Sequence, residues 1–290
     1  MSEILPTIEP KQVRRIRGTR ARNTASLVVM IVVGITFLLP FFWMVSTSVK
    51  IKADIFCVPP KWIPSQLRFQ NYTDALGYFP FLRYFLNTVT ITVFSTLGWL
   101  LSSALVAYGF ARLRFPGRNV LFYVLLSTMM LPAQVTMVPL FVIFRTLGWV
   151  DTFYPLIVPA YFGSPFFIFL LRQYFLGIPQ ELIDAARIDG SSELGIFSRV
   201  ILPLSKPALT AVAIFGLMYG WNDFLGPLIY LNSEKSKTVA LGLDAFRTFY
   251  GTDWQGLMSI STLMVIPMVV IFFFAQKYFV RGIALTGMKG

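Results

Sequence analysis

Histidine is absent from the chain, and cysteine occurs only once, as Cys57. The lack of histidine excludes every catalytic arrangement and metal site that needs an imidazole. A single cysteine excludes a disulfide within the chain and any site built from several thiolates. Acidic residues are also scarce, at 13 of 290. An enzyme with this composition would have to work with carboxylates or lysine alone.

Apolar residues, in contrast, make up 56% of the chain, and the mean hydropathy is +0.68, which is far above the range of soluble domains. A bilayer span needs about 20 mainly apolar residues, and a span without water must satisfy its backbone as a helix. The sequence therefore predicts an all-α, polytopic membrane protein with six transmembrane helices. The predicted spans are 23–49, 84–111, 119–144, 152–171, 207–233 and 254–276.

The basic residues predict the orientation of these spans. Sixteen of the 25 Lys and Arg residues fall in the N-terminal tail, the two turns after the second and fourth spans, and the C-terminal end. By the positive-inside rule, both termini are expected in the cytoplasm, and the first span is expected to be an uncleaved anchor. We assign the net charge of +12 to topology and contact with anionic lipid, and expect no nucleic-acid partner.

Two units follow from this pattern: a basic cytoplasmic tail over 1–22 and a transmembrane domain over 23–290. Two longer loops are expected outside. The first contains VPPKWIPSQLRFQNY, and the other covers about 232–253 without helical periodicity. Each loop is either a solvated connection with interfacial aromatic residues or a docking surface for an external partner.

The connection between the fourth and fifth spans, 177–205, is the most polar part of the domain. Its core, ELIDAARIDGSSELGIFSRVILP, holds four of the 13 carboxylates. Pro179 suits a first helical turn, Gly190 can take a positive φ and end that helix, and Ser191 or Ser192 can cap a second one. The sequence predicts two helices at the membrane surface. They form either a solvated linker or a surface on which a second soluble protein presses.

Charged and amide side chains inside the spans are few. Asn87 in the second span and Asn222 and Asp223 in the fifth are candidates for a substrate path. Asp223 has an equally good structural interpretation, as the cap of a broken helix before Pro227. A G-x-x-x-G pattern from Gly216 to Gly220 predicts close helix packing.

The segment D-A-A-x-x-x-G-x9-V-x-L-P, from Asp184 to Pro203, resembles the EAA loop of binding-protein-dependent ABC importers, with Asp184 and Val200 in place of the usual Glu and Ile. Further stretches resemble the shorter, six-span permease of the carbohydrate-importer family of the maltose-transporter type. These are AYGFARLRFPGR, MMLPAQVTMVPLF, LGWVDTFYPLIVP, WNDFLGPL and GIALTGMKG. The resemblance as a whole runs from about residue 26 to the C-terminus.

The resemblance implies a permease subunit in a bacterial or archaeal inner membrane, with a cytoplasmic coupling hairpin between spans four and five. Its partners would be a second permease, a dimeric ABC ATPase that binds the ATP and Mg²⁺, and an external solute-binding protein that delivers a carbohydrate. The chain itself would need no cofactor or metal, and it has no G-x-x-x-x-G-K-[ST] motif. The coupling residues carried over are Glu181, Asp184, Ala185, Ala186, Asp189, Gly190, Leu202 and Pro203.

The sequence leaves alternatives open both for the transported substrate and for the class of protein. An oligosaccharide is expected, but a sugar acid, a polyol or a glycerol phosphate ester would fit the same family. A stand-alone secondary carrier would be expected to show an internal repeat and intramembrane charges for ion coupling. A membrane enzyme would have only Asp223 for acid-base work, without a second acid or a histidine nearby.

Overall fold

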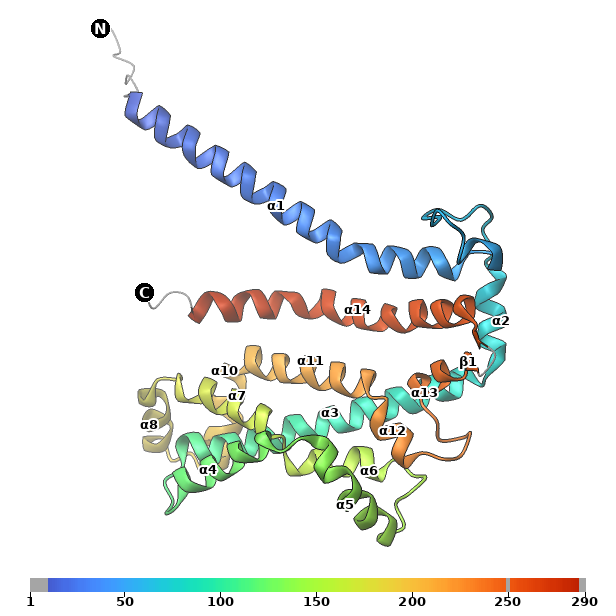
Figure 1. Ribbon diagram of the computed structural model, residues 1–290. Helices are drawn as coiled ribbons and strands as arrows, with labels where there is room; N and C mark the ends of the chain where they lie inside the picture. Colours follow the sequence, from blue (N-terminus) through green and yellow to red (C-terminus); the bar gives the residue numbers. More distant parts are fainter. Residues whose placement is uncertain (1–9, 249–250, 287–290) are drawn as a thin grey trace, which may run out of the picture.

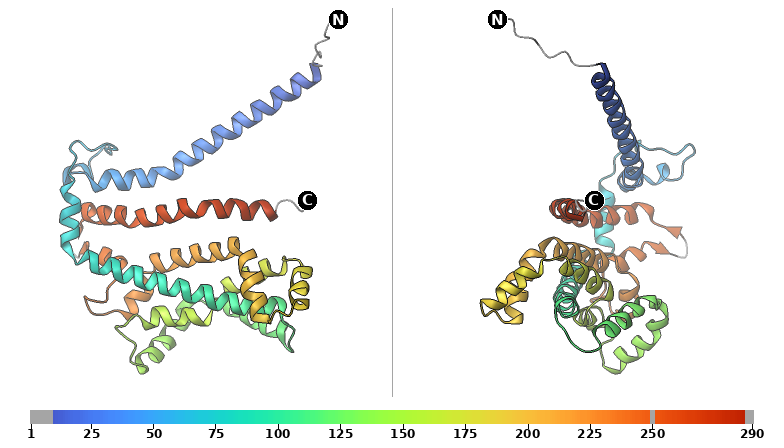
Figure 2. Two further views of the ribbon diagram at one scale, coloured as in Figure 1. Left: turned by 180° about the vertical axis from the view of Figure 1, so that it is seen from behind. Right: turned by 90° about the vertical axis from the view of Figure 1, so that its left-hand side faces the viewer.

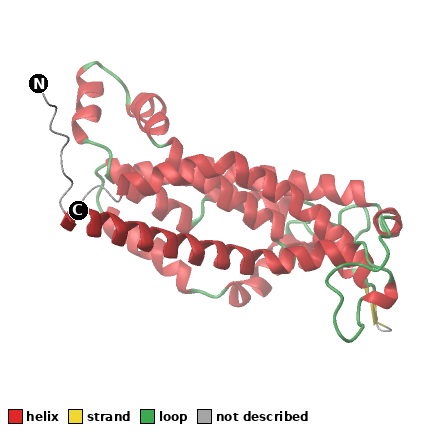
Figure 3. Ribbon diagram, turned by 90° about the horizontal axis from the view of Figure 1, so that it is seen from above, coloured by secondary structure: helices red, strands yellow, loops and turns green. Residues whose placement is uncertain are grey.

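The computed structural model describes residues 10–248 and 251–286, and helices dominate that part of the chain (Figures 1 and 3). The only strands among these residues form one short antiparallel pair, with Arg247 opposite Thr252. The elements in order are α1 (Pro10–Ser48), η1 (Lys52–Asp54), α2 (Gln70–Tyr78), α3 (Phe81–Arg112), α4 (Arg118–Ser127), η2 (Thr128–Met130), α5 (Ala133–Thr146), α6 (Tyr154–Ile157), η3 (Val158–Phe162), α7 (Pro165–Leu176), α8 (Gln180–Ile188), α9 (Glu193–Ile196), η4 (Phe197–Ile201), α10 (Leu202–Leu204), α11 (Lys206–Asn222), α12 (Leu225–Tyr230), α13 (Val239–Asp244), β1 (Arg247–Thr248), β2 (Gly251–Thr252) and α14 (Trp254–Thr286).

The long apolar helices agree with the predicted spans. Four segments are long and apolar enough to cross a bilayer without a sharp bend, and two bent pairs raise the possible number to six. The predicted all-α, polytopic fold is therefore confirmed. The four segments are Asn23–Ser48, Phe81–Arg112, Tyr154–Leu176 and Trp254–Phe274. The bent pairs are Arg118–Met130 with Ala133–Thr146, at 98°, and Glu193–Leu204 with Lys206–Asn222, at 80°.

Proline and extended residues produce the breaks. Leu131 and Pro132 have extended ψ values of 118° and 137°, and they separate η2 from α5. This follows from the steric clash that keeps the residue before a proline out of the helical region. In the fifth span, Asp223 has ψ 117° and divides α11 from α12. At this second break the Asp223 carboxylate accepts the Gly226 amide at 3.1 Å, so a side chain satisfies part of the freed backbone.

The helices run between two distinct ends of the molecule (Figure 2). The segment 180–204, here called the hairpin, lies at the same end of the molecule as the end of α14, and the start of α1 extends away from the bundle on that side (Figure 1). The opposite end, here called the loop end, carries α2, α13 and the β1–β2 pair. The predicted tail falls partly outside the described residues, since 1–9 are not described and 10–22 continue α1 as helix.

Helix α3 occupies the centre of the fold. Near the hairpin end, its Ala104, Ala107 and Ala111 pack with residues of α7, the hairpin and α11. The predicted G-x-x-x-G face also meets α3: a Cβ on Gly216 would lie 3.0 Å from Thr96 Cγ2, and one on Gly220 would lie 3.1 Å from Thr92 Cα. The two helices therefore approach as closely as their backbones allow.

Two features differ from the simplest reading of the sequence. The loop 232–253, expected without helical periodicity, contains the short helix α13, whose Val239 is fully buried. A helix of six residues is too short to show a helical period in the sequence. Its position in the fold depends instead on the burial of Val239. Helix α1 has no buried residue in its most apolar 18-residue window. Its side chains there are left to contact lipid or another subunit.

Candidate functional site

The hairpin begins as predicted and turns at the predicted glycine. Helix α8 starts after Pro179, and Gly190 has φ +78°, the left-handed conformation that glycine adopts without a Cβ clash. The Gly190 amide donates to Arg187 O at 3.0 Å, and the Ser191 amide donates to Ala186 O at 3.0 Å. These bonds satisfy carbonyls at the end of α8, so the turn is a stable C-terminal cap.

The second arm of the hairpin starts at a serine cap. Ser192 Oγ accepts a hydrogen bond from the Gly195 amide at 3.2 Å, as expected for an N-cap. The helical path then continues through α9, the π-helical turn η4 and α10, and bends by 80° into α11. The two arms thus connect α7 to α11 through a compact surface element.

One face of the hairpin is anchored in the bundle. Ile183, Ile196 and Ile201 are fully buried and join the cluster formed by α3, α7 and α11. The opposite face exposes apolar side chains, with Ile188 87% and Leu194 71% accessible. An anchored element that still exposes large apolar groups is suited to a partner.

The predicted coupling residues divide between these faces. Ala185 is exposed, whereas Ala186 is half-buried against the core cluster. Glu181, Asp184, Asp189 and Gly190 are exposed, Leu202 is half-buried and Pro203 is exposed. The outward surface is therefore formed by Ala185 and Ile188 together with the carboxylates of Glu181, Asp184 and Asp189.

Carboxylates of the hairpin are held by a small network. Arg187 donates to Asp184 at 3.3 Å and to Glu193 at 2.9 and 3.1 Å. Glu193 also accepts the Tyr108 hydroxyl at 2.6 Å. The hydrogen bond from Tyr108, followed by those from Arg187, lowers the pKa of Glu193. Glu193 therefore stays ionised and ties the second arm to α3.

The end of α3 makes a second attachment that sequence reasoning missed. Arg112 NH1 donates to Gln180 Oε1 at 2.8 Å, and its NH2 donates to the carbonyls of Phe175 and Ile178. The guanidinium thereby caps the end of α7 and contacts the first residue of α8. Tyr108 and Arg112 lie in AYGFARLRFPGR, so the signal was present, but the stretch had served only the family resemblance and, through its basic residues, the predicted topology.

A cavity of about 570 Å³ opens among the second to fifth spans. Aromatic side chains contribute much of its wall: the Trp99 ring lies 5.2 Å from that of Tyr219 and 5.9 Å from that of Phe167, both edge to face. Polar groups come from Ser95, Ser164 and Asp223. The lining residues are Ile91, Ser95, Trp99, Leu140, Phe144, Pro155, Leu156, Pro159, Ala160, Gly163, Ser164, Pro165, Phe166, Phe167, Tyr219, Gly220, Asp223, Gly226 and Tyr230.

The three substrate-path candidates are not brought together. Asp223 lines the cavity, and its Oδ1 accepts the Gly226 amide at 3.1 Å, as its capping interpretation predicts. Asn87 donates to the carbonyls of Lys235 and Lys237 at 2.9 and 2.8 Å, at the loop end. Asn222 donates to the carbonyl one turn earlier, at 2.8 Å. Of the three, Asp223 is the candidate whose position suits contact with a permeant.

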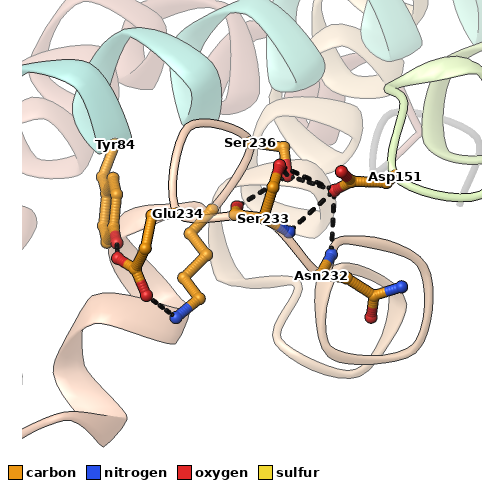
Figure 4. Close-up of polar contacts among 7 residues, drawn as sticks. Tyr84, Asp151, Asn232, Ser233, Glu234 and Ser236 are labelled. Atoms are coloured by element: carbon orange, nitrogen blue, oxygen red, sulfur yellow. Dashed lines mark hydrogen bonds and ion pairs between the residues drawn. The ribbon is translucent and has the colours of Figure 1, made fainter.

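The loop end has its own ordered segment, residues 232–238, here called the strap (Figure 4). Asp151 Oδ1 accepts hydrogen bonds from the amides of Asn232 and Ser233, both at 2.9 Å. It also accepts the hydroxyls of Ser233 at 3.0 Å and Ser236 at 2.6 Å. These bonds, the Ser233 amide first, hold the pKa of Asp151 well below its usual range. The ionised carboxylate thus fixes one side of the strap.

A groove of about 520 Å³ also lies on the loop end. It is lined by residues after α1 and residues around β1 and β2, including Phe56 and Trp254, whose rings meet edge to face at 6.1 Å. Behind it, buried Asp54 accepts Lys61 Nζ at 2.6 Å and the Ser65 amide at 2.9 Å. These contacts, Lys61 first, lower the pKa of Asp54 to about 2. The proline-rich outer loop is therefore folded around an internal ion pair.

The chain is similar in sequence to known membrane-transport proteins. Residues 100–285 match the sequence profile described as "Binding-protein-dependent transport system inner membrane component". The chain is 36% identical over 260 residues to the arabinooligosaccharides transport system permease protein AraQ of Bacillus subtilis, covering 89% of this chain and 92% of that protein. It is 30% identical over 263 residues to the diacetylchitobiose uptake system permease protein DasC of Streptomyces coelicolor, covering 90% and 95%.

Two solved structures share the fold. One is a bacterial ABC transporter involved in the import of the acidic polysaccharide alginate, with a TM-score of 0.77, 23% identity, and coverage of 95% of this chain and 100% of the matched chain. The other is a bacterial alginate ABC transporter in complex with an alginate pentasaccharide-bound periplasmic protein, with a TM-score of 0.63, 16% identity, and coverage of 89% and 94%. The arrangement of helices is thus shared with a chain in each of these two structures.

Proposed function

The chain belongs to the family of binding-protein-dependent transport system inner membrane components, and from this premise we propose that it imports a carbohydrate handed over by an external solute-binding protein. It is a membrane-embedded transport subunit rather than an enzyme. The hydrolysis of ATP would be performed by partner subunits, which would bind the nucleotide and Mg²⁺.

The observation that carries this proposal is the two-faced hairpin. Its inner face is buried in the bundle through Ile183, Ile196 and Ile201, while its outer face offers Ala185, Ile188 and nearby carboxylates. A small residue lets a partner approach closely, and a carboxylate can pair with a basic groove at the rim. The hairpin would therefore seat in a cytoplasmic ATPase and move with it. The coupling residues proposed are Glu181, Asp184, Ala185, Ala186, Asp189, Gly190, Leu202 and Pro203.

The two ends of the bundle and its uncovered apolar surface support the positions that we propose for the remaining partners. The hairpin end would face the cytoplasm, in agreement with its basic flanks, and both termini would lie on that side. The groove and strap at the loop end would receive the solute-binding protein. A second permease would complete the translocation path, since the apolar face of α1 and the open cavity leave surface that this chain does not cover.

The cavity supports a neutral sugar as cargo. Aromatic rings stack on the apolar faces of sugar rings, and a carboxylate accepts hydrogen bonds from hydroxyls. The lining contains Asp223 but no Lys or Arg. A sugar acid would place like charges in a site of low dielectric, which costs free energy. We therefore favour an uncharged oligosaccharide, the class named for AraQ and DasC, over a sugar acid or a phosphate ester.

Reconstitution tests the proposed function. The chain is assembled with its second permease and ATPase in proteoliposomes, and uptake of labelled neutral oligosaccharides is followed with the loaded binding protein outside. We expect uptake only when ATP, the ATPase and the binding protein are all present. Uptake by the chain without the ATPase would instead identify a stand-alone carrier, and the proposal would be wrong.

Substitution of Asp223 distinguishes a role in sugar binding from a role in capping α12. The Asp223→Asn variant keeps an oxygen that can accept the Gly226 amide, so α12 should remain capped. It loses the charge that strengthens hydrogen bonds to sugar hydroxyls. Such bonds contribute about 1.5–3 kcal/mol, so we expect roughly a tenfold or larger rise in the sugar concentration that half-saturates uptake.

The matched control for this change is Asp244→Asn, an exposed carboxylate on α13 outside the cavity. It should leave uptake unchanged. Half-saturation and turnover that match the unmodified protein in Asp223→Asn would leave Asp223 with the capping role alone.

A further inference from the structure

Helix α3 differs from every other span in having no proline. It runs through 32 residues without interruption, whereas proline occurs within or at the breaks of the other five. Proline removes a backbone hydrogen bond and kinks a helix, so its absence leaves α3 as the stiffest element. At 1.5 Å per residue, α3 is about 48 Å long, enough to reach beyond both faces of a bilayer. The prolines within or at the breaks of the other spans are Pro40, Pro132, Pro139, Pro155, Pro159, Pro165, Pro207, Pro227 and Pro267.

The inner end of α3 is attached to the hairpin. Tyr108 donates its hydroxyl to Glu193 at 2.6 Å, and its ring lies 5.2 Å from that of Phe197. One turn later, Arg112 contacts Gln180 and the two carbonyls that end α7. Both arms of the hairpin are therefore tied to one helix by directional contacts and by shared burial in the core cluster.

The outer end of α3 is attached to the strap in the same manner. The Tyr84 hydroxyl donates to Glu234, and Asn87 donates to the carbonyls of Lys235 and Lys237. The Val239 amide, just after the strap, donates to Thr88 Oγ1 at 3.0 Å. Figure 4 shows how Tyr84 and Asp151 grip the strap from two sides. The strap is thus fixed to the same rigid helix that holds the hairpin.

Between its ends, α3 has little freedom to slide. A Cβ on Gly98 would lie 2.7 Å from the Tyr161 ring, and Gly216 and Gly220 of α11 press on Thr96 and Thr92. Interfaces packed this closely move as units rather than deforming continuously. A displacement at one end of α3 should therefore appear at the other.

We propose that α3 transmits the conformational signal between the strap and the hairpin, with Asn87 and Tyr108 as the positioning residues at its two ends. The inference rests on the proposed function, because it supposes a partner at each end. Asn87, considered from sequence as a path residue, has its amide engaged by the strap instead. Docking of the loaded binding protein outside would thus be sensed by the ATPase through a single continuous helix.

The test uses the assembled complex and measures how much the sugar-loaded binding protein stimulates ATP hydrolysis. Tyr108→Phe removes one hydroxyl and keeps the ring contact with Phe197, while Asn87→Leu removes the amide at similar volume. Coupling between distant sites is typically at least fivefold, so each variant should lose about fivefold or more of the stimulation while unstimulated hydrolysis and assembly are retained.

The double variant gives the decisive readout. If both residues act on one path, Tyr108→Phe with Asn87→Leu should lose no more stimulation than the more impaired single variant. Losses that multiply, or unaltered stimulation in either single variant, would overturn the proposal. A merely structural role would lower assembly or unstimulated hydrolysis instead.

Matched controls carry the same chemical changes elsewhere. Tyr123→Phe and Asn119→Leu, both on α4, alter exposed residues and should keep full stimulation. If Asn87→Leu assembles poorly, Thr88→Val tests the same end, because it removes the acceptor for Val239. Failure of the unmodified complex to respond to the binding protein would count against the proposed function, and is distinct from failure of this inference.

Discussion

Replacement of Ala185 by Arg is expected to abolish ATP-driven uptake while the chain remains in the membrane. Ala185 lies on the exposed face of α8, so the new side chain can fold without disturbing the bundle. In the proposed complex, however, the same face is covered by the ATPase. Burying an unpaired charge costs several kcal/mol, and each 1.4 kcal/mol is a factor of ten, so uptake should fall about a hundredfold or more.

The control is Asn119→Arg, which adds the same charge to another exposed position at the hairpin end. Its uptake should equal that of the unmodified protein. Membrane content and thermal stability are measured in parallel, so that loss of protein is not mistaken for loss of coupling. Normal uptake by Ala185→Arg would mean that the exposed face of α8 is not the ATPase contact. The half-buried Ala186 is a poorer choice, because a large side chain there would first clash with the bundle itself.

Replacement of Gly220 by Val is expected to destabilise the fold strongly. A Cβ alone would lie 3.1 Å from Thr92 Cα, and 3.3 and 3.4 Å from the hydroxyl oxygens of Thr92 and Ser95. The nearest of these atoms is backbone, so it cannot move aside as a flexible side chain would. Overpacking of this kind costs about 1–3 kcal/mol, and the two further methyl groups of valine should bring it to the upper end. The unfolding temperature of the purified protein should fall by about 5–10 °C.

Two glycine-to-alanine variants distinguish the effect of steric crowding from the effect of helix propensity. Gly220→Ala gains up to about 1 kcal/mol of helix propensity, which only partly offsets the crowding, so a smaller loss is expected. Gly109→Ala, on α3, adds a Cβ that meets nothing within 4 Å and should be neutral or slightly stabilising. Equal unfolding temperatures for Gly220→Ala and Gly109→Ala would contradict the close approach of α11 and α3.

The elements that sequence predicted well are those set by local physics. Six apolar windows identified the spans, because a backbone without water must be helical. Gly190 and Ser192 identified the turn of the hairpin, because positive φ and side-chain capping are properties of single residues. Asp223 was recognised as a possible cap for the same reason, and its bond to the Gly226 amide agrees.

The elements that sequence did not predict depend on contacts between distant segments. Nothing near Tyr108 indicates that its hydroxyl reaches Glu193, which is 85 positions away. Asn87 looked like a path residue because a polar group in a span is usually functional, yet it meets carbonyls about 150 positions later. Spacing along one helix gives its faces, but it does not identify the loop that will lie against them.

The strap has one more consequence, for the kinetics of partner exchange. Its residues are held from two sides before anything docks, by Asp151 on one side and by Tyr84 and Asn87 of α3 on the other. The solute-binding protein proposed to dock here would therefore meet a surface that is already shaped, and its association would carry little entropic cost of ordering. Association and dissociation can then both be fast although the affinity is low. These kinetics suit a solute-binding protein that would have to bind, release its sugar and dissociate in every transport cycle.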